Sequence, residues 1–466
     1  MKQRVFILSS FLLLYLGNYL SAQTLNYYFG NLHSHSGYSD GNKDSTTSGC
    51  SRPVNDYAFA KASQHFDFLG ISEHNHYSSA HNPGMQLPRY AYGLSEAAAA
   101  NQENTFLCLY GMEWGVSSST NGHVVVYGFN QLIGWESGNY DIYNAQTDYD
   151  GLFKKVKNNP NAFCYLAHPY TTDFKYLATN PYNATYDSAI VGVPFRSGLA
   201  FSTNLTYSDY PAGNYFGYYT QLLAKGYKIG SGYDHDNHYT TFGRSNAGRL
   251  VIVAPALTTA NLYYAMKNMH FYGSDDWNAK VDFKINGSNI MGDIVTSALI
   301  PTISVTHNDG DGELADTIKV WSGVPGSGSS ATVLNSVSSN NVLTYTDASL
   351  VNNTTKYYFI EIIQTDGQRI VTSPIWYTYN TSAGIESYSN KSGINVFPNP
   401  FQNVIYLACP TRCSVEITDV MGRTVYKSNM SSGSTKINTE TFDNGIYFIN
   451  VISESGVIES FKMIKD

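Results

Sequence analysis

Short apolar runs alternate with helix-like stretches over residues 23–278. Apolar runs rich in β-branched and aromatic residues predict strands, here at residues 66–72, 105–111, 123–129, 162–168 and 250–254. The segments between them predict helices, at residues 54–64, 94–101, 149–158 and 259–269, the last with Thr258 or Thr259 as its N-cap. Strands separated by helices predict a parallel α/β arrangement, either an open sheet or a closed barrel.

The pattern changes at residue 279. From there to residue 380, apolar and polar positions alternate with a period of two and are interrupted by Gly, Asn and Asp turns, which predicts a β-sandwich accessory domain. A linker rich in Ser, Asn and Gly follows at residues 381–393, and residues 394–466 contain a further set of short predicted strands.

The amino terminus has the features of a targeting segment. Lys2 and Arg4 precede a mostly apolar run at residues 5–16, and Ser21-Ala22 offers a small-residue cleavage site. This order of features is that of a secretory signal peptide, here residues 1–22, which is removed from the mature protein. The sequence therefore predicts an exported protein.

Charge and composition narrow the possible partners. Hydrophobic residues make up 42% of the 466 positions, which excludes a disordered chain. Loss of Lys2 and Arg4 with the signal peptide takes the net charge from −8 to −10, so no nucleic-acid partner is expected. After the signal peptide no run of 18 apolar residues occurs, so we expect no membrane span in the mature chain.

Two smaller motifs have structural interpretations that require no catalytic role. Cys409 and Cys413 flank a three-residue segment and could close a hairpin disulfide in an oxidising compartment. The segment from Asp309 through Asp311 to Glu313 has the spacing of a calcium loop but lacks the remaining ligands of an EF-hand. We interpret it as a solvated turn.

Histidines concentrate in the α/β region. Ten of the twelve lie between residues 33 and 238. His33 and His35 are two positions apart after a strand, so their side chains share one face. Other potential ligands stand mostly at strand ends, where α/β folds build their sites: Asp40, His74, Glu113, His123, His168 and the run Asp234-His235-Asp236-Asn237-His238. Imidazole and carboxylate without thiolate suit Zn, Mn or Fe.

Six segments in this order resemble the polymerase-and-histidinol-phosphatase (PHP) superfamily of metallohydrolases, and most of all its branch related to carbaryl hydrolase. They are NLHSHSGYSDG, FLGISEHN, LYGMEWG, GHVVVYGF, AHP and DHDNH, and the match covers about residues 26–275. The resemblance implies a distorted β/α barrel that holds two or three divalent metal ions, Zn, Mn or Fe.

The resemblance also implies a role for each ligand. The implied metal ligands are His33, His35, Asp40, His74, Glu113, His123, His168, Asp236 and His238. Among these, Glu113 and Asp236 would bridge metals. Asp234 and His235 form a competing register for the last motif, and Glu73 stands where relatives carry Asp, in a position that orients a ligand.

The favoured function is that of an exported metal-dependent hydrolase, a phosphoesterase whose nucleophile is a metal-bound hydroxide. Glu113 and Asp236 would be catalytic, and Arg244 is the preferred residue for binding the phosphate of a small-molecule or phosphoester substrate. Two alternatives remain open: a surface-displayed binding protein with a non-catalytic metal-binding barrel, and a carbamate or ester hydrolase of the same fold.

The tail has a resemblance of its own. The segments INVFPNP, VEITDVMGRTVY, TFDNGIYFINV and FKMIKD are similar to the type A sorting domain of the Bacteroidetes type IX secretion system, over residues 394–466. This resemblance implies that the type IX machinery is a partner. It also implies that the protein is secreted or displayed on the cell surface after crossing the periplasm and the outer membrane.

Overall fold

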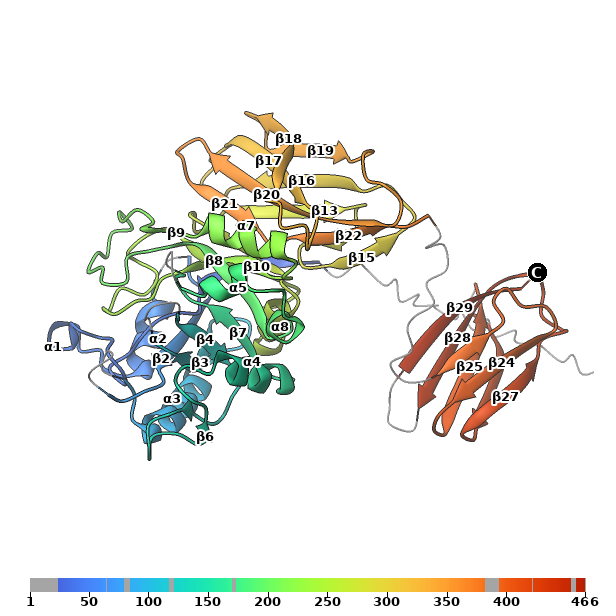
Figure 1. The fold of residues 1–466 in the computed structure, drawn as a ribbon, viewed down its shortest axis with the longest axis horizontal. Helices are drawn as coiled ribbons and strands as arrows, with labels where there is room; N and C mark the ends of the chain where they lie inside the picture. The colour runs from blue at the N-terminus through green and yellow to red at the C-terminus, as the bar shows by residue number, and fades with distance from the viewer. Residues whose placement is uncertain are drawn as a thin grey trace, which may run out of the picture. The chain divides into compact units, whose positions relative to one another are not determined.

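The computed structural model describes residues 24–63, 65–78, 84–116, 121–169, 173–381, 394–420, 422–453 and 458–465. The predicted signal peptide lies outside the described residues, as does the predicted linker apart from Thr381. The chain forms two compact units, one up to residue 384 and one from residue 385, and Figure 1 shows the elements of each. The predicted boundary at residue 278 falls inside the first unit.

An α/β region opens the first unit. Its strands are β1 (Asn26–Asn31), β2 (Phe68–His74), β3 (Leu107–Trp114), β4 (Val124–Tyr127), β5 (Ile133–Gly134), β6 (Ile142–Tyr143), β7 (Phe163–Leu166), β8 (Ile190–Ser197), β9 (Gly213–Asn214), β10 (Gly230–Asp234), β11 (Arg249–Ala254) and β12 (Phe271–Ser274). Its helices are α1 (Ser45–Ser48), α2 (Pro53–Lys61), α3 (Leu87–Ala100), α4 (Tyr149–Asn158), α5 (Lys175–Thr179), α6 (Ala184–Asp187), α7 (Phe216–Lys225) and α8 (Thr259–Lys267). The order across the main sheet is β10-β8-β7-β4-β3-β2-β1-β11-β12.

The strand directions are mixed. β1, β2 and β3 are parallel to one another, and so are β7, β8 and β10. β4 runs antiparallel to both β3 and β7, and β11 runs antiparallel to β1. The expectation of a parallel arrangement is therefore correct for two groups of strands and wrong for β4 and β11.

Beyond their last residues, the chain segments that continue β1 and β10 meet. Ser34 and Asn237 form a parallel bridge, the His35 N–H donates to the Asn237 carbonyl, and the Asp236 N–H donates to the His33 carbonyl. The first and last parallel strands of the region are thereby joined at their carboxyl ends. This pairing brings residues about 200 positions apart into one place.

Burial on both faces explains the sequence of the central strands. Every residue of β2, β3 and β4 is buried, as the near-continuous apolar runs require. Helix α4 spans residues 149–158, as predicted. Its buried apolar residues include Leu152, Phe153 and Val156. The Thr258 side chain accepts a hydrogen bond from the Asn261 N–H, so the predicted N-cap of α8 is confirmed as Thr258.

The sandwich strands continue the same sheet. They are β13 (Lys280–Ile285), β14 (Asn289–Ile290), β15 (Ile294–Ser297), β16 (Thr302–Asn308), β17 (Ala315–Gly323), β18 (Thr332–Ser338), β19 (Val342–Thr346), β20 (Thr354–Gln364), β21 (Arg369–Thr372) and β22 (Ile375–Tyr379). β12 pairs antiparallel with β21, so one sheet runs from the α/β region into the sandwich, and β14-β13-β16-β19 form a second sheet. Phe29, Val251 and Tyr272 of the α/β region belong to the sandwich core.

The second unit is all β. Its strands are β23 (Asn395–Phe397), β24 (Val404–Cys409), β25 (Cys413–Asp419), β26 (Thr424–Met430), β27 (Gly433–Asn438), β28 (Gly445–Ser453) and β29 (Ile458–Lys465), in sheets β23-β24-β27 and β26-β25-β28-β29. Cys409 and Cys413 are buried in its core and no disulfide joins them, or any other pair of the five described cysteines. They act as apolar core residues, and the predicted hairpin disulfide is wrong.

Candidate metal centre

The strand arrangement places the predicted ligands at one edge of the main sheet. His33 and His35 follow β1, His74 ends β2, and Glu113 is the penultimate residue of β3. His123 precedes β4, but β4 is antiparallel, so its first residue Val124 lies opposite Trp114 at the end of β3. Since Val124 also pairs with Leu166 at the end of β7, His168 reaches the same edge. Asp236 and His238 follow β10. We call the nine predicted ligands the histidine–carboxylate cluster.

Glu113 lies at the centre of this cluster and is fully buried. Its Oε1 is 3.1 Å from His33 Nε2, 2.9 Å from His123 Nδ1 and 3.2 Å from His168 Nε2. Its Oε2 is 3.3 Å from His35 Nε2 and 2.9 Å from His74 Nδ1. Each carboxylate oxygen thus faces a different group of imidazoles, which is the geometry that a bridging carboxylate requires.

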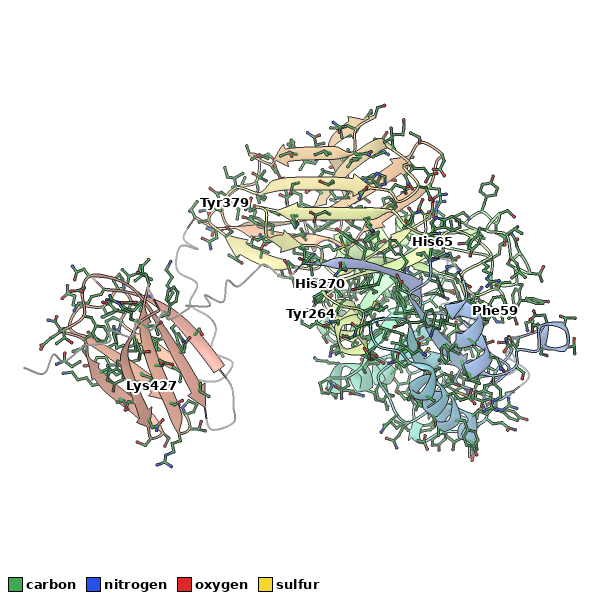
Figure 2. The ribbon with its side chains drawn as sticks, turned by 180° about the vertical axis from the view of Figure 1, so that it is seen from behind. Phe59, His65, Tyr264, His270, Tyr379 and Lys427 are labelled. Carbon is green, nitrogen blue, oxygen red and sulfur yellow. The ribbon has the colours of Figure 1, made fainter. Side chains whose placement is uncertain are left out.

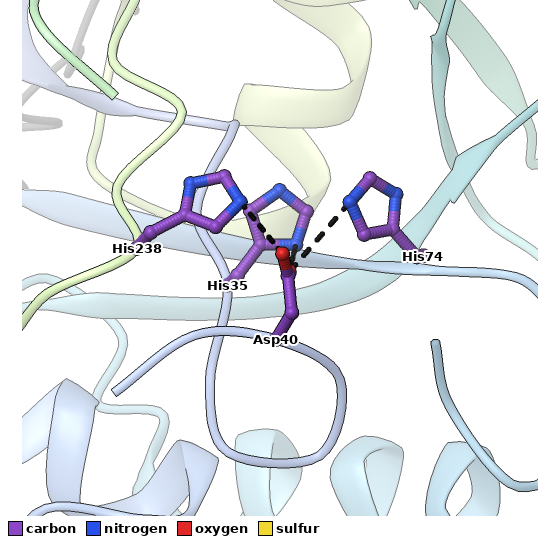
Figure 3. A group of neighbouring side chains, drawn as sticks. All are labelled: His35, Asp40, His74 and His238. Atoms are coloured by element: carbon purple, nitrogen blue, oxygen red, sulfur yellow. Dashed lines mark ion pairs between the residues drawn. The ribbon is translucent and has the colours of Figure 1, made fainter. Parts of the chain in front are cut away.

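A second part of the cluster surrounds Asp40 (Figure 3). Its Oδ2 is 3.2 Å from His238 Nε2, and its Oδ1 is 3.6 Å from His74 Nε2 and 3.8 Å from His35 Nδ1. The dashed lines in Figure 3 mark these ion pairs, with the three imidazoles arranged around one carboxylate. One carboxylate oxygen and three ring nitrogens lie close enough together to bind a single cation.

The last motif resolves into two different environments. Asp236 Oδ1 is 3.0 Å from His35 Nε2, 3.2 Å from His33 Nε2 and 3.6 Å from His238 Nδ1, so Asp236 and His238 both belong to the cluster. The backbone of Asp236 is left-handed, with φ of 52°. His235 points elsewhere: its Nε2 contacts the Gly248 carbonyl oxygen at 2.7 Å.

Two further carboxylates orient the histidines. Asp234 Oδ1 is 2.9 Å from His33 Nδ1, which leaves Nε2 of His33 directed at Glu113, and Asp234 Oδ2 accepts from the His168 N–H. Glu73 is buried, accepts from the Ser36 N–H and from the Ser36 and Ser39 hydroxyls, and lies 4.0 Å from His35 Nδ1. Sequence reasoning anticipated the orienting position of Glu73 but missed that of Asp234, because only the fold brings Asp234 beside His33.

The electrostatics match a site that attracts cations. Burial raises and nearby histidines lower the pKa of Glu113, and the net result is a pKa well below the usual value. Burial lowers the pKa of His33, but Asp234, Glu113 and Asp236 raise it well above its usual range. Outside the cluster, burial and then Arg249 lower the pKa of His235 to about 3. The neighbouring carboxylates therefore stabilise positive charge at His33, whereas burial keeps His235, and within the cluster His74, at a lowered pKa.

A pocket of about 330 Å³ adjoins the cluster. Its walls are His168, Asp236, residues 197–202, Ala212, Gly213 and Tyr215. No lysine or arginine is among these described lining residues. Outside the walls, the Lys43 Nζ is 3.5 Å from Asp40 Oδ2 and 5.6 Å from the centre of the ring of Phe201, a lining residue. Apolar and small side chains therefore dominate the space beside the cluster.

Arg244 does not reach the cluster. Its Nε donates to the Ser63 hydroxyl, its Nη2 donates to the Ala62 carbonyl, and its guanidinium lies over the ring of Phe59, a residue of α2 labelled in Figure 2. These contacts tie Arg244 to the end of α2. Six residues after His238 the chain has turned away from the strand ends, so Arg244 is not brought together with the other predicted site residues.

The donor set fits divalent metals. Buried ring nitrogens of His33 and His123 have no hydrogen-bond partner among the described residues and lie close to carboxylate oxygens of Asp234 and Glu113. Three overlapping groups of ligand atoms could each hold an ion: His35, Asp40, His74 and His238; His33, His35, Glu113 and Asp236; and His74, Glu113 and His123. The set of imidazole and carboxylate ligands suits Zn, Mn or Fe rather than Ca.

Comparison with known proteins assigns the tail. Residues 395–466 match the family model described as the secretion system C-terminal sorting domain. The protein is therefore exported through the type IX secretion system, to the cell surface or to the medium, and that machinery is a partner. No helix in the described part of the chain is long and apolar enough to cross a membrane.

No curated protein matches the chain. Among solved structures, the fibronectin(III)-like modules of Clostridium thermocellum CbhA share 14% identity over 40% of this chain and 94% of theirs, with a TM-score of 0.18. PorZ of Porphyromonas gingivalis shares 15% identity over 47% of this chain and 35% of its own, with a TM-score of 0.15. The α-L-rhamnosidase of Aspergillus terreus shares 9% over 39% and 28%, with a TM-score of 0.20. TM-scores this low define no common fold.

Proposed function

We propose that the α/β region is a metal-dependent hydrolase of the PHP type, with two or three divalent ions held by the histidine–carboxylate cluster. One observation carries the proposal: the buried Glu113 carboxylate contacts five imidazoles from the ends of four strands, all within 3.3 Å. Burying five imidazoles around one carboxylate would destabilise an ordinary protein core, because each buried polar group costs free energy unless it is paired.

The strand order supports a barrel of the PHP type. The strands β1, β2, β3, β4, β7, β8 and β10 follow one another in the sheet, β1 also pairs with β11, and the Ser34–Asn237 bridge joins the segments that continue β1 and β10. Contact between the segments that follow the first and last strands of such a series supports the proposed closure into a barrel. The cluster lies at the mouth formed by the carboxyl ends of the parallel strands, where β/α barrels carry their active sites.

Each residue then has a definable task. Glu113 and Asp236 would bridge neighbouring ions, Asp234 keeps Nε2 of His33 available by holding its Nδ1, and Glu73 fixes the loop that carries His35. Divalent ions at such a site supply Lewis acidity and an activated water at neutral pH. A separate serine or cysteine nucleophile is then unnecessary. The pocket beside His168 and Asp236 would hold the substrate.

Phosphoesters remain the first substrate class to test, since paired divalent ions can clamp a phosphoryl group. One observation favours a second candidate, a carbamate or ester hydrolase. No lysine or arginine is among the described walls of the pocket, and Arg244 is bound to α2. A site that recognises a free phosphate monoester usually presents such a cation. The apolar walls suit an uncharged leaving group instead.

The test is turnover by the mature chain, residues 23–466, loaded with Zn, Mn or Fe(II). p-Nitrophenyl phosphate, bis-p-nitrophenyl phosphate and a naphthyl carbamate distinguish monoesterase, diesterase and carbamate hydrolase. We expect hydrolysis of at least one of the three that requires added metal and disappears with a chelator. Metal binding without turnover of any of them would favour a surface-displayed binding protein.

Glu113→Gln is the decisive variant because it keeps the shape of the side chain and removes its charge. We expect the bound metal to fall by at least one ion per chain and the activity to fall by roughly 100-fold or more, beyond the usual cost of losing an orienting partner. Elemental analysis gives the metal content. Glu103→Gln is the matched control, because Glu103 is an exposed carboxylate that accepts a hydrogen bond from the Thr259 N–H at the start of α8. Full metal stoichiometry in Glu113→Gln would rule out the bridge.

A further inference from the structure

A second group of acidic side chains lies apart from the histidine–carboxylate cluster, where the α/β region meets the sandwich. Asp276 follows β12, Asp309 and Glu313 belong to the connection between β16 and β17, and each offers an oxygen within 4.8 Å of the others. We call these three residues the acidic triad. The sequence pattern alone indicated a solvated turn at Asp309, because the third carboxylate comes from a distant part of the chain.

Backbone hydrogen bonds fix two of the three carboxylates. Asp276 Oδ1 accepts from the N–H groups of Asn278 at 2.6 Å and Ala279 at 3.0 Å. Asp309 Oδ1 accepts from the N–H groups of Asp311 at 2.7 Å and Glu313 at 3.2 Å. Each side chain is therefore oriented before any ligand arrives.

Positive charge is missing from this place. No lysine, arginine or histidine in the described part of the chain forms an ion pair with a member of the acidic triad. Burial and then the neighbouring Asp276 raise the pKa of Glu313 to about 7, and burial also raises the pKa of Asp276. Carboxylates crowded in this way repel one another unless one of them is protonated or a cation compensates them.

An independent observation comes from Gln364 at the end of β20, which is 1% exposed. Its Nε2 is 3.2 Å from Asp309 Oδ2 and 3.5 Å from Glu313 Oε2, while its Oε1 is buried and has no hydrogen-bond partner among the described residues. The two ends of an amide have nearly the same shape. A half-turn of this amide would present Oε1 to the acidic triad as a neutral oxygen ligand.

We propose that Asp276, Asp309, Glu313 and Gln364 form a calcium site that links the α/β region to the sandwich. Carboxylate and amide oxygens without any nitrogen or sulfur ligand are the set that Ca²⁺ prefers. The histidine–carboxylate cluster has the opposite preference, so the two sites select different metals. An exported protein meets calcium concentrations at which weak extracellular sites, with Kd on the order of 10⁻⁴ to 10⁻³ M, are filled.

Trp277 gives the site its own spectroscopic reporter. Its Nε1 donates to Asp311 Oδ2 at 3.0 Å, and it is the neighbour of Asp276 in sequence. Terbium replaces calcium at oxygen sites and emits when a nearby tryptophan is excited. We expect the mature chain, loaded with its catalytic metal, to show terbium emission that decreases when calcium displaces the terbium. Its melting temperature should rise by several degrees at about 5–10 mM calcium, a concentration roughly ten times Kd.

Two conservative variants test the ligands. Asp309→Asn and Glu313→Gln keep an oxygen at each position, and each is expected to weaken calcium affinity about tenfold or more, measured by calorimetric titration. Asp282→Asn, at a partly exposed carboxylate of β13 paired with Lys284, is the matched control and should bind as the wild type does. Trp277→Phe should lose terbium emission and keep the calcium-induced thermal shift.

Three results would overturn the proposal: no calcium binding by the wild type, unchanged affinity in both ligand variants, or an equal loss in Asp282→Asn. The result does not depend on the proposed hydrolase activity. Glu113→Gln, which should lose catalytic metal, is expected to bind calcium normally at the acidic triad because the two sites share no residue.

Discussion

Asp234 shows how a single residue outside the ligand set can control it. It contacts Nδ1 of His33 with one oxygen and the backbone of His168 with the other. A histidine ligand held in this way presents its second ring nitrogen in a fixed orientation and is a stronger base. Asp234 is therefore a positioning residue, and its effect passes through His33.

We expect Asp234→Asn to weaken metal affinity by about 10- to 100-fold while the protein still folds, because the amide keeps one hydrogen-bonding oxygen. Metal affinity from competition with a chelating dye checks this directly. A merely structural role would lower the melting temperature of the metal-free protein without a change in affinity. Recovery of activity at high metal concentration would distinguish lost affinity from lost chemistry.

The two histidines of the last motif provide a contrast within four residues. The Nε2 of His238 is 3.2 Å from Asp40 Oδ2, whereas the Nε2 of His235 is 2.7 Å from the Gly248 carbonyl oxygen. We expect His238→Ala to lose an ion and most of the activity. His235→Ala should keep full metal content and lose about 1 kcal/mol of unfolding free energy, because the Gly248 carbonyl loses one hydrogen bond but still accepts one from Arg249.

Elemental analysis and denaturant titration of both variants check this contrast. An active His238→Ala protein with full metal content, beside an inactive His235→Ala, would reverse the assignment. The sequence favoured Asp236 and His238 because residues two apart on an extended segment face the same way. It could not decide the matter, since the left-handed backbone of Asp236 breaks that extended segment.

At the scale of elements, local pattern missed α7 and β8 and placed the start of α3 seven residues too late, but it predicted several other helices and strands to within a few residues. Helix α4 and the α8 cap are examples, because amphipathic spacing and a threonine before an apolar helix are local signals. The direction of β4 was not predictable, because apolar runs look alike in parallel and antiparallel strands. Yet that direction is what carries His123 to the edge occupied by Glu113.

The cap of α8 supports a prediction of its own. Thr258 accepts from the Asn261 N–H at 3.2 Å, which satisfies one of the unpaired donors of the first turn. Thr258→Ala is expected to lower the unfolding free energy by about 1 kcal/mol, with no change in metal content. Denaturant unfolding at constant m-value measures it. A Thr258→Ser variant should retain most of the stability, since serine caps equally well; equal losses in the two would argue against the cap.

At the scale of the whole molecule, the site and the export signal belong to different compact units. The cluster lies entirely within residues 33–238, and the sorting domain begins at residue 395. Deletion of residues 394–466 should therefore leave metal content and any hydrolysis unchanged within about twofold, while the protein fails to reach the outside of the cell. Fractionation and assay of the retained protein check both halves. Loss of activity on deletion would show that the tail supports the site.

The pairing of β12 with β21 has a consequence for the order in which the protein can fold. Ser274 lies beside Ile370 in one sheet, although 95 intervening residues must be synthesised and exported between them. Until β21 arrives, the edge of β12 presents unpaired backbone groups, and an unpaired edge strand invites association with other chains. The sandwich thus covers an aggregation-prone edge of the sheet. A chain that stopped at residue 278 would carry every ligand of the cluster but would leave the edge of β12 unpaired.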